Sequence, residues 1–298
     1  MSDASHDVLV STVVVGYENP EDVERCLHSI AAVDPALLED LTLVDHSATE
    51  RCRTVADRFD VQYVPSPNRG FGAGANVGAR LSRGRFLFFL NPDAELRSAL
   101  TPVVAAVGGR NGAWAGVALL TDAGQTHADA YRLWFFSVQR ALDRLLVRLR
   151  LRKPPAGRPL QKLCGGAMVV PRDVFRDVGG FDEAFFLYGE DADLTLRLAE
   201  QAVELVLLRD VFVEHRAGSS GRRTPVPIQA HQGFSAIYLV GKHKGHLWAV
   251  LALAEMVVVS IAGAVAWALV HREDRRGGLA RMARITGGAR ALAALWSG

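Results

Sequence analysis

Short apolar runs alternate with longer amphipathic stretches from residue 8 to about residue 120 of the chain. The run at 86–90 is apolar throughout, which is typical of a strand that is buried on both faces of its sheet. Asn19 and Pro20 are residue types that favour the start of a helix. The pattern predicts strands at residues 9–15, 41–44, 61–64 and 85–90. It predicts helices at 20–30 and 72–81, and one that follows the second strand and ends at 59.

This alternation predicts an α/β fold with a mainly parallel central sheet, because strand–helix–strand units form right-handed crossovers. In such sheets, ligands bind beyond the carboxyl ends of the strands. A further strand is predicted at 164–170, with helices from 172 and over 190–202. Three polar segments follow predicted strands at the ligand-binding edge: 17–19, 45–47 and 91–93.

The C-terminal third contains a long apolar run, from Leu247 to Val270, with a single charge at Glu255. A spanning helix needs about 20 such residues, and a carboxylate near its centre costs about 3 kcal/mol. Both flanks of the run are basic, so the positive-inside tendency favours the cytoplasmic side for both. We therefore expect a re-entrant or interfacial helix pair. A single crossing and a buried or dimer-forming helix are the alternatives.

A second basic stretch, at 140–153, places Leu142, Leu145, Leu146 and Leu149 at helical spacing, with arginines on the other face. This is typical of a helix that lies on anionic lipid, although a solvated amphipathic helix on the core has the same pattern. Together with the apolar run, it predicts peripheral or re-entrant association with the cytoplasmic face of the membrane. The predicted division is a catalytic domain at 1–245 and a membrane-associating helical region at 246–298.

Composition narrows the class of protein. Formal net charge is +2 over 298 residues, which argues against a strongly basic nucleic-acid-binding protein. The three cysteines, Cys26, Cys52 and Cys164, form no CxxC pair, which argues against a disulfide scaffold or a cysteine-rich zinc module. The acidic N-terminus and short first apolar run do not fit a signal peptide, so we expect a cytosolic start.

Asn91 and Asp93 follow the buried strand at 85–90, and their side chains are oxygen donors of the kind that Mg²⁺ or Mn²⁺ binds together with phosphates. Asn-Pro-Asp is also good turn chemistry, so a simple turn is the alternative. His215 comes after another predicted strand and could complete a metal site, or could be a surface histidine. Arg216 and Arg222 are candidates for contact with phosphate oxygens.

Three carboxylates, Glu190, Asp191 and Asp193, open a predicted helix. Acidic residues at this position stabilise a helix through its dipole and its cap, which is one interpretation. The other is a general base, with Asp191 and Glu190 as candidates, because a carboxylate in a cleft can accept a proton from an attacking hydroxyl. Asp193 falls on a different side of the first helical turn.

The segment Asn68–Asn76 is rich in glycine, and Gly70, Gly72 and Ala75 match the dinucleotide pattern G-x-G-x-x-A. The match is weak because the segment follows the third predicted strand and not the first. A glycine-rich helix start can bind a nucleotide phosphate without NAD, and Asn68 and Gly70 are the candidates for this contact.

Taken in order, these segments resemble family 2 glycosyltransferases of the GT-A fold, over about residues 8–245. Within the family, the chain looks most like rhamnosyltransferases of cell-wall and O-antigen assembly that add rhamnose to N-acetylglucosaminyl-diphospho-polyprenol. The segments that carry the resemblance are 13–19, 43–47, 68–76, 90–93, 179–183, 188–191 and His215.

The resemblance implies a role for each matching residue. Tyr17 and Asp45 would lie against the nucleobase and ribose. Asp93, with Asn91 in place of the usual first aspartate, and His215 would hold the divalent metal (Mg²⁺ or Mn²⁺) and the donor diphosphate. Asp191 would be the catalytic base, with Glu190 beside it. His46 stands where the family usually has asparagine.

The implied activity is inverting transfer of a sugar, with dTDP-rhamnose favoured as donor, to a hydroxyl of a polyprenyl-diphosphate-linked saccharide. No nucleic acid is expected as a partner. Two other functions remain open at this point. One is a non-catalytic, membrane-bound protein that binds sugar nucleotides, and the other is an NAD-dependent oxidoreductase suggested by the glycine pattern.

Overall fold

The computed structural model describes residues 8–108, 113–122, 125–126, 128–152, 160–215, 225–270 and 275–297. The chain divides into two compact units. Unit 1 comprises Met1–Arg132, Leu160–Glu183 and Leu194–Ala217, and unit 2 comprises Leu133–Pro159, Ala184–Asp193 and Gly218–Gly298. Unit 2 thus includes segments from the middle of the chain, whereas the domain boundary predicted from the sequence lies at residue 245.

Unit 1 is built on the predicted parallel strands. They are β1 (Val10–Gly16), β2 (Leu41–Asp45), β3 (Gln62–Pro65) and β4 (Phe86–Leu90), in the spatial order β3-β2-β1-β4. Every neighbouring pair in this group is parallel. All residues of β1, β2 and β4 are buried, which explains why their sequences are almost continuously apolar. The predicted α/β fold is confirmed.

Helices connect these strands at the predicted places: α1 (Pro20–Val33), α2 (Arg53–Phe59) and α3 (Phe71–Leu81), with a short 3-10 turn at Pro35–Leu38. Proline occupies the first position of α1, where its missing N–H costs nothing. Val23, Leu27 and Ile30 recur at helical spacing and are fully buried. Local periodicity was therefore sufficient to predict this part of the fold.

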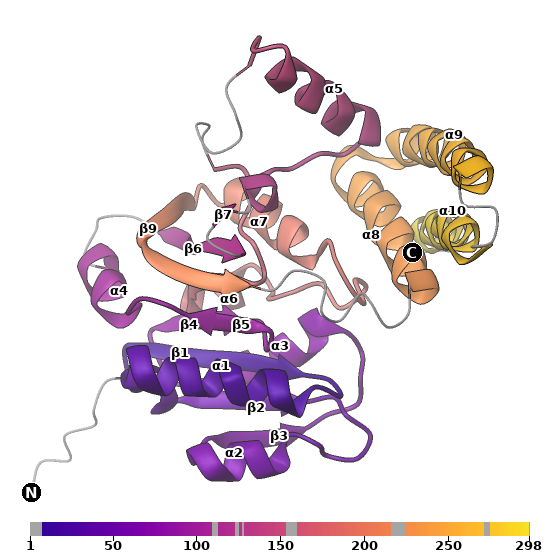
Figure 1. Ribbon diagram of the computed structural model, residues 1–298. Helices are drawn as coiled ribbons and strands as arrows, with labels where there is room; N and C mark the ends of the chain where they lie inside the picture. The colour runs from indigo at the N-terminus through magenta and orange to yellow at the C-terminus, as the bar shows by residue number, and fades with distance from the viewer. Residues whose placement is uncertain are drawn as a thin grey trace, which may run out of the picture. The chain divides into compact units, whose positions relative to one another are not determined.

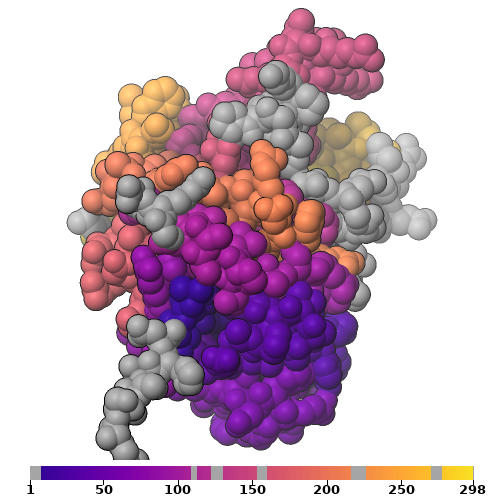
Figure 2. Space-filling model, turned by 90° about the vertical axis from the view of Figure 1, so that its left-hand side faces the viewer, coloured from indigo at the N-terminus to yellow at the C-terminus, as the bar shows by residue number. Residues whose placement is uncertain are grey.

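The sheet continues beyond β4 with mixed strand directions. The strands are β8 (Ala167–Pro171), β6 (Trp114–Asp122), β9 (Glu204–His215) and β5 (Ala94–Leu96), with β7 (Gln125–Thr126) beside β6. β8 is antiparallel to β4 and β6, β6 is parallel to β9, and β9 is antiparallel to β5. The long strand β9 is visible as an orange band in Figure 1, and its residues lie against the purple first third of the chain in Figure 2.

The remaining elements of unit 1 are α4 (Thr101–Gly108), a 3-10 turn at Ala128–Tyr131, α6 (Arg172–Asp177) and most of α7 (Glu190–Glu200). Phe89, Phe175 and Phe181 form an aromatic cluster, with ring centroids 5.1–5.4 Å apart. This cluster packs Phe181, in the middle of the segment at 179–183, against β4.

Unit 2 is helical in its described part, with α5 (Ser137–Arg148), the first turn of α7, α8 (Pro225–Lys244), α9 (His246–Val270) and α10 (Arg275–Ser297). The last three helices lie side by side (Figure 1). Their shared core contains Ile237, Val240, Ala252, Met256 and Ala291. The apolar run at 247–270 is one continuous helix, long and apolar enough by length and composition to cross a membrane.

Candidate active site

Asp93 and His215 come together at one end of the sheet in unit 1. Asp93 lies between β4 and β5, and His215 is the last residue of β9. The antiparallel pairing of β5 with β9 places His215 opposite Ala94. As a result, Nε2 of His215 lies 3.2 Å from Oδ1 of Asp93, and both side chains are mostly buried.

Asn91 contacts the same nitrogen of this imidazole. Its amide nitrogen Nδ2 lies 3.2 Å from Nε2 of His215. The backbone of Asn91 is fixed because its N–H donates to the carbonyl of Gly166 at 3.1 Å, and its carbonyl accepts from the N–H of Ala94 at 3.1 Å. Residues 91–94 therefore form a turn, and the side chains of Asn91 and Asp93 still meet at His215.

This donor set fits a divalent cation. Two ligands at right angles on Mg²⁺ lie about 3 Å apart, given bonds of about 2.1 Å, and Nε2 of His215 is 3.2 Å from Oδ1 of Asp93. Rotation of the Asn91 amide by half a turn would present its oxygen instead of its nitrogen. Within the described ranges, no group of three His, Cys, Asp or Glu side chains could hold a metal, so Asp93 and His215 would need Asn91 or donor phosphates to complete the site.

Tyr17 stands at the carboxyl end of β1 with 57% of its surface exposed, so its ring is available to a ligand. The next residue, Glu18, connects the loop after β1 to the loop after β2 through hydrogen bonds. The N–H of Glu18 donates to Oγ of Ser47 at 2.8 Å, and its carboxylate accepts from Arg51 at 3.1 Å. The loop that carries Tyr17 is thus held by contacts that local sequence pattern does not reveal.

Asp45, at the end of β2, is completely buried. Its carboxylate accepts hydrogen bonds from the N–H of Ser47 at 2.9 Å, the N–H of Cys52 at 3.0 Å and the hydroxyl of Tyr63 at 2.9 Å. Burial by itself raises the pKa of this carboxyl, but the hydrogen bonds outweigh it and leave the pKa below its ordinary value. Asp45 therefore orders the loop after β2, and its contact with a nucleotide stays a prediction.

His46 is only 5% exposed and packs against α3. A Cβ added at Gly74 would lie 2.7 Å from Cε1 of His46, so only glycine lets the helix approach this closely. Burial lowers the pKa of His46, although the negative charge of Asp45 acts in the opposite direction. Among the residues that the structure describes, Nε2 of His46 has no hydrogen-bond partner.

The glycine-rich segment opens α3, after β3, as expected. Gly70 precedes the helix with φ of 100°, a conformation that favours glycine. The N–H of Gly70 donates to Oδ1 of Asn68 at 3.1 Å, which closes a local turn. Gly74 and Gly78, which are not part of the G-x-G-x-x-A match, allow close packing of α3 against β1.

Asn76, at the end of that segment, was given no role by sequence analysis. Its amide nitrogen donates to the carbonyl of Phe181 at 2.9 Å, and its amide oxygen accepts from the N–H of Phe181 at 2.9 Å. The nitrogen also lies 3.2 Å from Glu183, which pairs with Arg69 at 3.1 Å. The side chain thus joins two of the family-like segments, 68–76 and 179–183.

The acidic turn at the start of α7 belongs to unit 2, and its three carboxylates differ in surroundings. Glu190 is 7% exposed and Asp193 is completely buried, whereas Asp191 is partly exposed. Asp193 binds α8, with Oδ1 2.7 Å from Nζ of Lys242 and 2.9 Å from Nε2 of His243. Of the two residues predicted as candidates for a general base, Asp191 is thus the more accessible. Arg216 and Arg222 lie outside the described residues.

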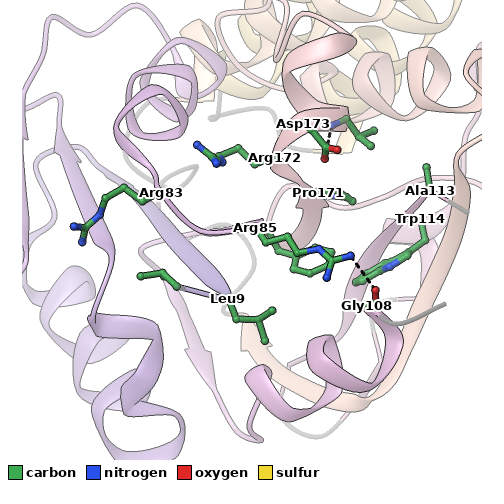
Figure 3. A pocket seen from close by; sticks show the side chains of 12 residues that line it. Leu9, Arg83, Arg85, Gly108, Ala113, Trp114, Pro171, Arg172 and Asp173 are labelled. Carbon is green, nitrogen blue, oxygen red and sulfur yellow. Dashed lines mark hydrogen bonds between the residues drawn. The ribbon is translucent and has the colours of Figure 1, made fainter. Parts of the chain in front are cut away.

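A hollow of about 700 Å³ lies at the other edge of the sheet, beside the amino-terminal ends of β1 and β4. Leu9, Trp114 and three arginines contribute to its lining, and it includes none of the predicted site residues. Figure 3 shows Arg83 and Arg85 extending in opposite directions, so their guanidinium groups do not converge on one point.

Solved structures of similar fold include glycosyltransferases with the GT-A architecture. A mannosyltransferase from Pyrobaculum calidifontis, solved with GDP-Man and Mn²⁺, aligns with TM-score 0.54 and 15% identity over 95% of this chain and 86% of that chain. Glucosyl-3-phosphoglycerate synthase from Mycobacterium tuberculosis, solved with Mn²⁺, UDP and glucosyl-3-phosphoglycerate, aligns with TM-score 0.52 and 17% identity over 78% and 79%. The fold is therefore that of this class of transferase.

The family match is specific. Residues 11–179 match glycosyl transferase family 2, and the chain belongs to this family. Residues 148–216 also match the family described as the N-terminal domain of galactosyltransferase. The expectation of a family 2 glycosyltransferase with the GT-A fold is confirmed.

Two curated relatives are similar over parts of the chain. N-acetylglucosaminyl-diphospho-decaprenol L-rhamnosyltransferase from Mycobacterium tuberculosis is 38% identical over 95 residues, which is 32% of this chain and 31% of the relative. Low-salt glycan biosynthesis hexosyltransferase Agl10 from Haloferax volcanii is 22% identical over 221 residues, 66% of this chain and 63% of the relative. The matched part thus spans about a third of the rhamnosyltransferase.

Proposed function

We propose that this chain is an inverting glycosyltransferase that moves L-rhamnose from dTDP-rhamnose to a hydroxyl of a polyprenyl-diphosphate-linked saccharide. The observation that carries the reaction class is the pairing of Asp93 with His215 within segments matched by glycosyltransferase families. The choice of rhamnose and of a lipid-linked acceptor rests on the partial similarity to the mycobacterial rhamnosyltransferase.

In the proposed mechanism, Asp191 accepts the proton of the acceptor hydroxyl as its oxygen attacks the anomeric carbon of the donor. The new C–O bond forms as the bond to the nucleotide diphosphate breaks on the opposite face, so the anomeric centre inverts. A partly exposed carboxylate suits this role because the acceptor hydroxyl must reach it. The exposed ring of Tyr17 would stack on the nucleobase.

Asp93, His215 and Asn91 would hold Mg²⁺ or Mn²⁺. The fit rests on the carboxylate, imidazole and amide groups that meet around Nε2 of His215. When bound, such a cation neutralises charge that develops on the departing diphosphate. Mn²⁺ is named with the mannosyltransferase of similar fold, which supports a divalent cation here.

A lipid-linked acceptor places the reaction at a membrane, and we propose the cytoplasmic face. The exposed arginines of α5 and the apolar helix α9 support this location. A catalytic domain that rests on the membrane surface meets its acceptor at a higher effective concentration than a freely diffusing domain does.

The test is sugar transfer to the lipid fraction of membranes that contain this chain, with dTDP-rhamnose and UDP-sugars offered in parallel. We expect transfer of rhamnose that chelation of divalent cations abolishes and that Mg²⁺ or Mn²⁺ restores. Asp191→Asn is expected to lower the transfer rate by about 10²–10⁴-fold while donor binding persists. Asp177→Asn, at a carboxylate that is 69% exposed in unit 1, is the matched control and should leave the rate unchanged.

Each other outcome changes a defined part of the proposal. Transfer from a UDP-sugar alone would contradict the rhamnose assignment but keep the mechanism. Full activity of Asp191→Asn would remove this residue from the role of base. Tight nucleotide binding without transfer from any donor would favour a sugar-nucleotide-binding protein over an enzyme.

A further inference from the structure

Glu255, the one charge in the apolar run, binds the start of α5. Its Oε2 accepts a hydrogen bond from the N–H of Ser137 at 3.1 Å, and its Oε1 accepts one from the N–H of Val138 at 2.6 Å. These N–H groups belong to the first turn of α5, where no carbonyl of the helix itself can accept them. A carboxylate is also favoured there by the helix dipole. Glu255 therefore connects the first half of α9 to the amino-terminal end of α5 (Figure 1).

The outward face of α9 is apolar along its whole length. Leu247, Leu251, Val258, Val265 and Leu269 recur at helical spacing and are 47–71% exposed. Only 22% of the most apolar stretch of α9 is buried. A surface helix of a water-soluble protein normally carries polar residues on its outward face, so this face requires a covering apolar environment.

α5 carries a second exposed apolar stripe together with basic charge. Val138, Leu142, Leu145 and Leu149 are 50–60% exposed and also recur at helical spacing. The arginines of α5 are exposed as well, at positions 140, 144 and 148. Its one acidic residue, Asp143, is 4% exposed and pairs with Arg152 at 2.6 Å. The exposed charge of α5 is therefore positive, which complements anionic lipid headgroups.

The contacts of Glu255 are incompatible with a membrane-spanning α9. At 1.5 Å per residue, Glu255 lies about 14 Å from the start of the helix, close to the middle of a 30 Å hydrocarbon core. The amino-terminal turn of α5, and Arg140 within it, would lie at the same depth. Lipid hydrocarbon offers no hydrogen-bond partner to an arginine at that depth.

We propose that unit 2 binds the surface of an anionic phospholipid bilayer through the outward faces of α5 and α9, with α9 lying along the membrane and not across it. The apolar stripes enter the boundary between headgroups and acyl chains, and the arginines contact lipid phosphates. This inference rests on the membrane location in the proposed function and specifies the surface that makes the contact. Its test measures membrane binding and not sugar transfer. A failure of either proposal can therefore be told from a failure of the other.

The first experiment is sedimentation of the full chain with vesicles of phosphatidylglycerol and phosphatidylcholine, compared with pure phosphatidylcholine. We expect binding to the anionic vesicles that weakens several-fold at high salt. Arg144→Glu should weaken binding by about fivefold or more, whereas Arg176→Glu, at a 77% exposed arginine of unit 1, should not. Val258→Glu should likewise weaken it, with the exposed Phe212→Glu on β9 as its control.

The second experiment separates surface binding from spanning. Extraction of cell membranes at pH 11 should release the wild-type chain. If α9 spanned the bilayer, Glu255→Leu would remove a charge from its centre and strengthen retention. On the present proposal, Glu255→Leu is still released and instead exposes α5 to faster trypsin cleavage at 140–148. Glu255→Gln, which keeps one acceptor oxygen, should show less of this effect.

Three outcomes would overturn the proposal. One is retention of the wild-type chain at pH 11, and another is equal binding to both kinds of vesicle. The third is a folded chain that does not bind vesicles and is dimeric by light scattering, because a second copy would then cover the apolar faces.

Discussion

The side chain of Asn76 pairs with the backbone of Phe181 as a neighbouring strand would, because it donates to the carbonyl and accepts from the N–H of that residue. Asn76 and Phe181 are 105 residues apart, and both hydrogen bonds are buried. Polar groups buried in this way are costly to leave without partners. Asn76 therefore holds the segment at 179–183 against α3.

Asn76→Ala is expected to lower the free energy of unfolding by about 3 kcal/mol, since it leaves the N–H and the carbonyl of Phe181 buried without partners. Urea denaturation of the purified chain measures this. Asn19→Ala is the matched control, because Oδ1 of Asn19 accepts a bond from Tyr17 that is exposed to water. Equal losses of unfolding free energy in the two variants would show that the buried hydrogen bonds of Asn76 contribute no more than the exposed one of Asn19.

Glu255 and His46 show a limit of residue-by-residue interpretation. In the sequence, Glu255 is an expensive charge in an apolar run, whereas in the structure it accepts two backbone hydrogen bonds from α5. His46 lies in a polar segment at the ligand-binding edge, yet it is buried against Gly74. In both cases, the group in contact lies on another helix, α5 for Glu255 and α3 for His46, and the local sequence does not show that this helix lies nearby.

Among the elements, α7 contributes residues to both units. Its first turn, with Asp191 and Asp193, belongs to unit 2, and the rest of the helix belongs to unit 1. Asp193 is buried between Lys242 and His243 of α8. The acidic turn is therefore more than a helix cap, since one of its carboxylates attaches it to α8 next to the proposed base.

Asp193→Ala is expected to destabilise the chain by about 3 kcal/mol, because it removes the carboxylate that compensates the charge of Lys242. Combining it with Lys242→Met should cost less than the single change, because no unpaired ammonium group is then left. Thermal or urea unfolding of both variants measures the difference. A double variant that is less stable than Asp193→Ala would contradict the charge-compensation argument.

Elements were predictable to different degrees. The strands β1, β2 and β4 and the helix α1 follow from hydrophobic spacing, because each strand is buried along its whole length and the helix buries one regular face. The partners of β9 were not predictable. β9 pairs in parallel with β6 and antiparallel with β5, and its register with β6 shifts at Ala118 and Leu119. Spacing along one strand carries no information about such neighbours.

At the scale of the whole molecule, we expect stability to depend on pH through His46, which is buried in unit 1, and His231, which is half-buried in unit 2. Burial lowers the pKa of His46 in unit 1, and burial with Arg290 nearby lowers that of His231 in unit 2, from the ordinary value of 6.5. Below pH 6.5 the unfolded chain binds more protons than the folded chain at these sites. Stability is therefore expected to fall as the pH falls from 7 towards 5.

His46→Asn should reduce the slope of stability against pH in this window, as measured by urea unfolding at several pH values. His28→Asn, at an imidazole that is 62% exposed, is the control. A second loss is expected below the ordinary aspartate value of 3.8, where Asp40 and Asp45 lose contributions that depend on their lowered pKa values. An unchanged slope in His46→Asn would exclude His46 as a source of the first loss.

The order of motifs along the chain was enough to identify the family and the α/β fold, because strand and helix periods and short-range turns are local properties. The meeting of Asn91 with His215, 124 residues away, depended on strand order and register. The capping of α5 by Glu255, over 118 residues, depended on helix packing. Such contacts arise only when the folded chain brings distant groups within hydrogen-bond distance, so tertiary structure alone assigned these side chains their partners.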